Sequence, residues 1–157
     1  MEIPNRTREL GTENSFEVLS EVNQLKNAGK DIVNFCIGQP DFDTPQHIKD
    51  AAITSIREGK TGYTDSAGIF PAREAVARYI SRTREIDANP DHVVIGNGSK
   101  HFIAFIILCT TDFGVGDEVI YPNPGYPIYE SQIIANGAVP VPLPLTEKMK
   151  FSFKIEE

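Results

Sequence analysis

The stretch GNGSK, at residues 96–100, has the composition of an anion-binding turn. It follows a short apolar run and precedes a helical pattern, and the unpaired amides and positive dipole at a helix start favour an anion. Glycines at 96 and 98 allow close backbone approach, while Ser99 adds a hydroxyl donor and Lys100 a positive charge. A tight turn with Ser99 as the helix N-cap is the structural alternative. The stretch matches neither GxxxxGK[ST] nor GxGxxG, so no nucleotide fingerprint is present.

A second stretch, YPNPGYPIYE at residues 121–130, surrounds Tyr126 with three prolines. Prolines fix the backbone and favour a surface loop, which makes a presented ring a better interpretation than a core ring. The carboxyl ends of adjacent parallel strands face one crevice, which would bring Tyr126 close to an anion on Ser99. A flat ligand stacked on this ring would gain about 1–3 kcal/mol, by analogy with bases stacked on aromatic side chains.

Alternating helical and extended patterns predict the elements that position these two stretches. Amphipathic or apolar periodicity predicts helices over 15–29, 45–59, 70–84, 99–110 and 127–136, with Thr44 as the N-cap of the second. Short apolar runs predict strands over 31–38, 92–96 and 116–121, and an extended, proline-rich edge strand over 138–145. The pattern indicates an α/β fold, a three-layer αβα arrangement with a mostly parallel sheet, preceded by an N-terminal arm and helix. The apolar residues 102–108 are expected in the core.

Composition excludes several classes of function. The net charge of -7 argues against nucleic-acid binding, which needs clustered Lys and Arg. Cys36 and Cys109 lie far apart, show no metal-ligand spacing, and fit a reducing cytoplasm better than a disulfide framework. Asp41 and Asp43 are interpreted as turn and capping residues. The longest apolar run, residues 102–109, is too short to span a membrane, and the N-terminus has no signal-peptide core.

Four motifs in order, together with the spacing between them, resemble the class I/II aminotransferases, which are fold-type I enzymes that use pyridoxal 5'-phosphate. They cover residues from about 15 to 150: GQPDFDTP, KTGYTDSAG, GNGSK, GDEVIYPNPGYPIYE and the spacing between them. The resemblance implies that the residues contributing to the cofactor's phosphate site are Gly98, Ser99 and Lys100. It also implies that Tyr126 stacks on the pyridine ring.

The same resemblance implies two roles at other positions. Tyr63 would reach across a homodimer interface to the partner's cofactor phosphate, and Gly38 would lie where the substrate carboxylate docks. From the residues alone, Tyr63 is an ordinary loop aromatic and Gly38 a turn glycine before Pro40. We expect residues 1–44 to contribute an arm, a helix and a connector to a small domain, and residues 45–157 to form the first part of the cofactor-binding domain.

The resemblance also implies what lies elsewhere in such an enzyme. No motif here matches the Schiff-base lysine, the acid for the pyridine nitrogen or the arginine for the substrate carboxylate, so no catalytic residue is assigned. We expect a truncated chain, inactive alone, from an enzyme that moves an amino group from an amino acid to a 2-oxo acid. A lyase or synthase of the same fold, a sensor domain of a transcription regulator, and a structural or dimerising fragment are the alternatives.

Overall fold

The computed structural model describes residues 7, 10 and 15–153, so the predicted arm lies largely outside the described residues. The chain forms two compact units, one of residues 1–38 with 98–157 and the other of residues 39–97. They are described separately below. The predicted division at residue 44 concerns the domains of the whole enzyme and stays a prediction.

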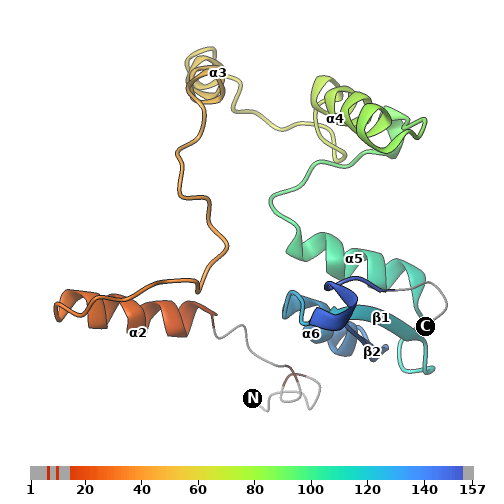
Figure 1. The fold of residues 1–157 in the computed structure, drawn as a ribbon. Helices are drawn as coiled ribbons and strands as arrows, with labels where there is room; N and C mark the ends of the chain where they lie inside the picture. Colours follow the sequence, from red (N-terminus) through yellow and green to blue (C-terminus); the bar gives the residue numbers. More distant parts are fainter. Residues whose placement is uncertain (1–6, 8–9, 11–14, 154–157) are drawn as a thin grey trace, which may run out of the picture. The chain divides into compact units, whose positions relative to one another are not determined.

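Among its described residues, the first unit contains helix α2 before residue 38, and helix α5 followed by a strand–helix–strand segment after residue 98 (Figure 1). In chain order, its elements are α2 (Ser15–Asn27), α5 (Lys100–Thr110), β1 (Glu118–Asn123), α6 (Ile128–Ala135), β2 (Val139–Pro144) and the short 3₁₀ helix η2 (Glu147–Met149). Each of these helices and strands was predicted from the sequence to within a few residues, except the terminal 3₁₀ turn.

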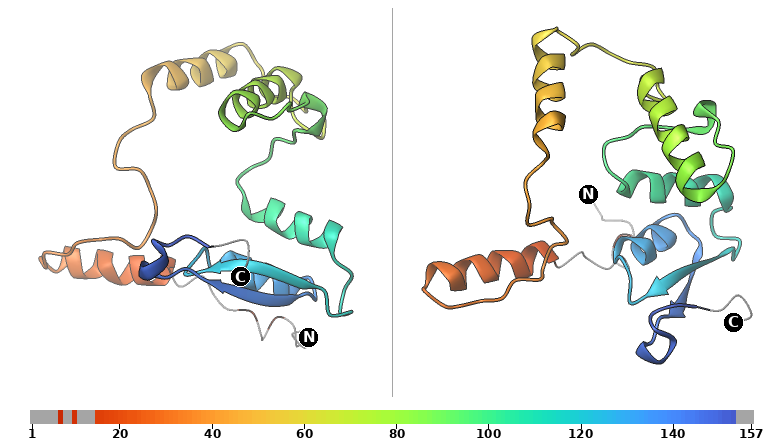
Figure 2. Two further views of the ribbon diagram at one scale, coloured as in Figure 1. Left: turned by 45° about the vertical axis from the view of Figure 1, so that its right-hand side comes forward. Right: turned by 45° about the horizontal axis from the view of Figure 1, so that its top comes forward.

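Strands β1 and β2 pair in parallel and α6 connects them (Figures 1 and 2). Their register places Glu118 opposite Val139 and Asn123 opposite Pro144. A small core joins α5, α6 and the end of the connection through Ile107, Ile133 and Ala138, and Val119 and Tyr121 of β1 pack against it. Because Val119 and Tyr121 point to the same side of the strand, α5 and α6 both cover that face of the sheet.

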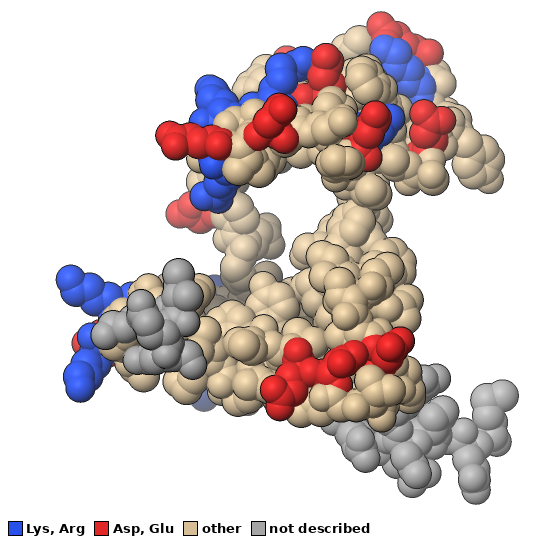
Figure 3. Space-filling model, turned by 90° about the vertical axis from the view of Figure 1, so that its right-hand side faces the viewer, with Lys and Arg blue, Asp and Glu red and all other residues tan. Residues whose placement is uncertain are grey.

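The second unit contains α3 (Gln46–Arg57), α4 (Phe70–Arg84) and the 3₁₀ helix η1 (Pro90–His92). Helix α4 is tied to the following segment by its own side chains. Arg73 donates a hydrogen bond to the Pro90 carbonyl at 3.3 Å and lies 3.6 Å from an oxygen of Asp91. On α4, Arg78 and Glu74 form an ion pair at 3.1 Å. Figure 3 shows basic and acidic side chains interspersed in the upper part of that view.

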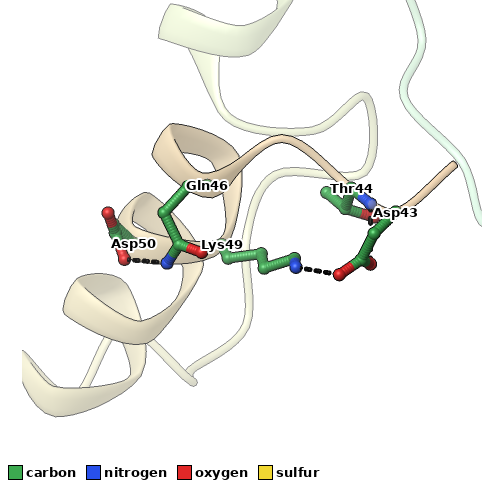
Figure 4. Close-up of polar contacts among 5 residues, drawn as sticks. All are labelled: Asp43, Thr44, Gln46, Lys49 and Asp50. Carbon is green, nitrogen blue, oxygen red and sulfur yellow. Dashed lines mark hydrogen bonds and ion pairs between the residues drawn. The ribbon is translucent and has the colours of Figure 1, made fainter.

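The N-cap of helix α3 lies one residue later than predicted. Pro45 occupies the N-cap position, and Thr44 instead donates its amide to a carboxylate oxygen of Asp43 at 2.8 Å. The other carboxylate oxygen of Asp43 pairs with Lys49 on the first turns of the helix (Figure 4). Thr44 is therefore not the cap, because the helix starts after Pro45 and no side chain makes a capping hydrogen bond there. The interpretation of Asp43 as a turn residue agrees with this arrangement.

The predictions of strands over residues 31–38 and 92–96 are wrong. Residues 31–38 are not strand, and the Asn34 side chain accepts the Cys36 amide at 2.9 Å, which bends the chain there. Residues 92–96 begin in η1 and continue extended, with the Ile95 amide bonded to the Ala67 carbonyl at 2.9 Å. An apolar run becomes a strand only where another strand pairs with it, and these segments have no such partner among the described residues.

The expectation of a buried stripe over residues 102–108 is only partly met. Ile107 is buried, whereas Phe105, Ile106 and Leu108 are more than half exposed. Within the part of the chain that the structure describes, no helix is long and apolar enough to cross a membrane.

Candidate functional site

The turn before α5 has the backbone geometry that its glycines suggest. Gly98 has a φ of 89°, in the left-handed region, and an added Cβ would meet nothing within 4 Å. Ser99 stands at the N-cap position, but its side chain makes no capping hydrogen bond. Its carbonyl accepts the Ile103 amide at 3.1 Å, which closes the first helical turn. The start of α5 therefore combines an exposed, sterically open backbone with the positive end of an eleven-residue helix.

The proline loop holds Tyr126 at the edge of the first unit's core. Its ring is half-buried and lies edge-to-face with Tyr129, with the ring centroids 5.8 Å apart and an interplanar angle of 89°. The Asn123–Pro124 peptide is cis. Gly125 is required by close packing, since a Cβ there would lie 2.2 Å from the Pro122 carbonyl oxygen. Tyr126 is thus fixed on both sides and is not enclosed in the core.

One cavity joins the proline loop, the start of α5 and the start of α2. It has a volume of about 440 Å³, and its wall includes Gly38, Lys100 and Tyr126. Of the residues selected from the sequence, these three are brought together by the structure. Sequence reasoning missed the other main wall residues, which are Phe16, Cys36 and Ile37. Nothing in the spacing of these residues indicated a cavity.

Lys100 extends toward the start of α2. Its Nζ lies 6.0 Å from the centroid of the Phe16 ring, at the outer limit of a cation–π contact. The ammonium group therefore brings positive charge to a cavity wall that is otherwise uncharged, since the remaining wall residues are apolar, hydroxyl, thiol or glycine. Such a wall suits a ligand with an anionic group and a flat apolar body.

A second, smaller cavity of about 220 Å³ lies beside the same loop and includes Tyr121, Asn123, Tyr126 and Glu130 in its wall. Burial raises the pKa of the Tyr121 phenol, and the Glu130 carboxylate raises it further by its charge and by accepting the phenolic hydrogen bond. This pair connects the end of β1 to the first turn of α6, the two elements that flank the loop.

The remaining selected residues are not on the wall of the 440 Å³ cavity. Gly98 and Ser99 directly precede Lys100 but do not line it. Tyr63 belongs to the other compact unit and is fully exposed there. In the described part of the chain, no group of three or more His, Cys, Asp or Glu residues is arranged to hold a metal ion. The binding roles of all six selected residues stay predictions.

The described site belongs to an α/β domain. It combines a glycine turn at the start of α5 with an aromatic ring, Tyr126, that lines the 440 Å³ cavity. Residues 30–157 match the family Aminotransferase class I and II. The chain belongs to this family and corresponds to its amino-terminal part.

Individual relatives agree with that assignment. The chain is 35% identical over 155 residues to a probable aspartate/prephenate aminotransferase of Aquifex aeolicus, covering 99% of this chain and 39% of that protein. It is 41% identical over 130 residues to the (5-formylfuran-3-yl)methyl phosphate transaminase of Methanocaldococcus jannaschii, covering 81% of this chain and 35% of that protein.

A solved structure gives the same result. The aspartate aminotransferase of Thermus thermophilus with maleate superposes with a TM-score of 0.90 at 29% identity, over 99% of this chain and 40% of that one. The predicted partial αβα fold is confirmed by this similarity. The chain spans about two-fifths of the length of the relatives it matches.

Proposed function

We propose that this chain is part of a pyridoxal 5'-phosphate-dependent aminotransferase that moves an amino group from an amino acid to a 2-oxo acid. The observation that carries the proposal is the shared cavity of Gly38, Lys100 and Tyr126 in a chain of the aminotransferase family. The relatives' names support amino transfer over the lyase, synthase and regulator alternatives, since those reported above are aminotransferases or transaminases.

The residues present fit the cofactor. Its phosphate is a dianion, which suits the open backbone at Gly98, the Ser99 hydroxyl at the start of α5 and the Lys100 ammonium. Its pyridine ring is flat, which suits the side of Tyr126 that faces the cavity. Gly38, on the same wall, leaves room for the substrate carboxylate. When bound, the cofactor supplies an aldehyde and an electron-accepting ring to the amino group of the substrate.

The residues of this chain then bind and orient. Ser99 and Lys100 fix one end of the cofactor, Tyr126 fixes the plane of the ring, and Phe16 and Ile37 form an apolar part of the cavity wall. No residue of the chain is assigned to proton transfer. We infer that the lysine serving the reaction belongs to another part of the enzyme, and that the 157 residues alone do not catalyse transfer.

The proposal extends to assembly and location. Tyr63, fully exposed in its own unit, would reach the cofactor phosphate of a second subunit in a homodimer. Amino acids and 2-oxo acids would be the substrates, with no nucleic-acid or membrane partner, and the enzyme would act in the cytoplasm. Aspartate is the first substrate to test, because several relatives are named aspartate aminotransferases.

The experiment has two parts. The complete enzyme is assayed for transfer of the amino group of aspartate to 2-oxoglutarate, and for the visible absorbance of bound cofactor. Binding of pyridoxal 5'-phosphate is then compared with binding of pyridoxal, which lacks the phosphate. We expect amino transfer by the complete enzyme. We also expect it to bind pyridoxal 5'-phosphate more tightly than pyridoxal, and we expect Ser99→Ala to reduce this difference in affinity.

Two results would contradict the proposal. The first is a complete enzyme with no bound cofactor and no transfer from any common amino acid. The second is equal affinity for pyridoxal and its phosphate, since that would remove the anion-binding role of the α5 start.

A further inference from the structure

Phe16 is a large apolar side chain that the core of the first unit leaves exposed. It lies in the first turn of α2 and is 59% exposed, whereas Val22 on the same helix is buried. Its ring forms part of the wall of the cavity of about 440 Å³, together with Ile37 after α2 and Pro127 of the proline loop. Apolar groups on a cavity wall favour a ligand with a matching apolar part, because both surfaces leave water on binding.

The binding mode proposed above directs the substrate side chain to this apolar part of the wall. In that binding mode the cofactor phosphate lies at Lys100, the cofactor ring lies on Tyr126, and the substrate carboxylate lies at Gly38. An amino acid carries its carboxylate, its amino group and its side chain on the same carbon. With the carboxylate at Gly38 and the amino group directed to the cofactor, the wall that remains for the side chain is Phe16 and Ile37.

Charge on the wall distinguishes two classes of substrate side chain. Among the described residues that line the cavity, Lys100 is the only charged one, and the cofactor phosphate is its ligand in the proposed binding mode. A carboxylate on the substrate side chain would lie against Phe16 and Ile37 without a second cation from this wall, and burial of an unpaired charge is strongly unfavourable. An aliphatic or aromatic side chain would instead bury its surface there, and an aromatic one would also pair with the Phe16 ring.

We propose that Phe16 and Ile37 contact the side chain of the substrate, and that the complete enzyme prefers amino acids with an aromatic or large aliphatic side chain to dicarboxylic ones. This inference rests on the proposed function and names its substrate class. Phe16 determines the specificity, because a change of its side chain alters the shape and charge of this wall while Lys100 and Tyr126 stay on the cofactor. The relatives' names make aspartate the first donor to assay, and the wall predicts that aspartate reacts more slowly than phenylalanine.

The test compares amino-acid donors in the complete enzyme. A single turnover with each donor is followed through the visible absorbance of the bound cofactor, which needs no 2-oxo acid and therefore excludes any preference for the acceptor. We expect the second-order rate constant to be at least about tenfold higher for phenylalanine than for aspartate, with leucine between them. Equilibrium binding of two unreactive acids gives a readout without turnover, and 3-phenylpropionate should bind more tightly than succinate.

Variants of Phe16 distinguish substrate contact from general stability. Phe16→Arg supplies a cation at this wall and should shift the ratio of the phenylalanine and aspartate rate constants toward aspartate by at least about tenfold. Phe16→Leu stays apolar and should lower the rate constant for phenylalanine about two- to tenfold, with little change for leucine, because only the ring pairing is lost.

Val18→Arg is the matched control. Val18 lies on the same helix, is 47% exposed and is not on the wall of this cavity. The substitution adds the same charge to α2 and should leave the ratio of the phenylalanine and aspartate rate constants unchanged.

Three results would overturn the inference. The first is a wild-type enzyme that reacts with aspartate as fast as with phenylalanine, or faster. The second is a ratio that Phe16→Arg shifts no more than Val18→Arg does. The third, which decides if Phe16→Arg does not fold, is an unchanged ratio of phenylalanine to leucine in Phe16→Leu.

Each of these results would leave the proposed function intact, since the enzyme would still bind the cofactor and react with amino acids. Failure of the proposed function is seen separately, as a complete enzyme without cofactor absorbance before any amino acid is added. That result would remove this inference as well.

Discussion

Tyr126 and Tyr129 lie edge-to-face, with ring centroids 5.8 Å apart and planes at 89° to each other. Tyr129 stands in the first turn of α6, so this contact joins the loop ring to a helix that packs on both strands. An edge-to-face pair contributes about 0.5–1.5 kcal/mol beyond the area it buries. The orientation of the Tyr126 ring is therefore fixed by the folded unit as well as by the prolines of its loop.

Replacement of Tyr126 should separate ring stacking from the phenolic hydroxyl. We expect Tyr126→Ala to weaken retention of pyridoxal 5'-phosphate by the complete enzyme about tenfold to a hundredfold, the range for loss of one stacked aromatic. Tyr126→Phe keeps the ring and should stay within a few-fold of the wild type. Equilibrium dialysis measures both constants. Unchanged retention in Tyr126→Ala would exclude stacking on this ring.

Gly98 should be required for its backbone conformation. Its φ of 89° is strained for any residue with a Cβ, although the space around it is open. We expect Gly98→Ala to lower the free energy of unfolding by about 1–2 kcal/mol, as measured by urea denaturation. Gly38→Ala is the matched control, because Gly38 also has open space and no positive φ. Equal stability of the two variants would show that the turn relaxes without cost.

Lys100 should act on the phosphate and not on the ring of the cofactor. We expect Lys100→Gln to weaken binding of pyridoxal 5'-phosphate about two- to fivefold, with a larger effect at low salt, since an exposed charge is screened. Binding of pyridoxal should not change. Calorimetric titrations of both compounds at two salt concentrations give the four constants. An equal loss for both would mean that Lys100 instead supports the cavity wall through Phe16, whose ring lies 6.0 Å from its Nζ.

The sequence predicted local features of this fold well. Helix α4 was expected over residues 70–84 and spans Phe70–Arg84, because its periodicity and its proline near the first turn are both local signals. Residues 92–96 have an equally clear apolar pattern but are not a strand. A strand depends on a neighbour from elsewhere in the chain, and no local pattern specifies that neighbour.

The candidate site was predictable only in part for the same reason. GNGSK and the proline loop could be identified from their glycines and prolines, because the backbone preferences of these residues are local. The positions of Phe16 and Ile37 on the cavity wall depend on tertiary packing of segments far apart in the chain, so their types alone gave no signal. The prolines of β2 indicated an edge strand, whereas the strand with which β2 pairs and the register of that pairing required the structure.

The phenol of Tyr121 should give the chain a distinct response at alkaline pH. Burial and the Glu130 carboxylate both raise its pKa above the ordinary value of about 10. The folded state therefore holds this proton more tightly than the unfolded state does. The resulting stabilisation is complete below the ordinary pKa and is lost as the pH rises through the raised pKa of the folded state.

Two variants make that pH dependence measurable. Tyr121→Phe should abolish this part of the alkaline loss in the free energy of unfolding, and subtracting its ultraviolet titration from that of the wild type isolates the Tyr121 phenol. Glu130→Gln should lower the pKa of Tyr121 but leave it above the ordinary value, because burial, the larger cause, remains. A wild-type Tyr121 that titrates with the ordinary pKa would mean that the phenol is solvated and that Glu130 does not hold it. In that case β1 and the first turn of α6 would lack this link, and the loop that carries Tyr126 would depend on the ring contact with Tyr129 and on its prolines.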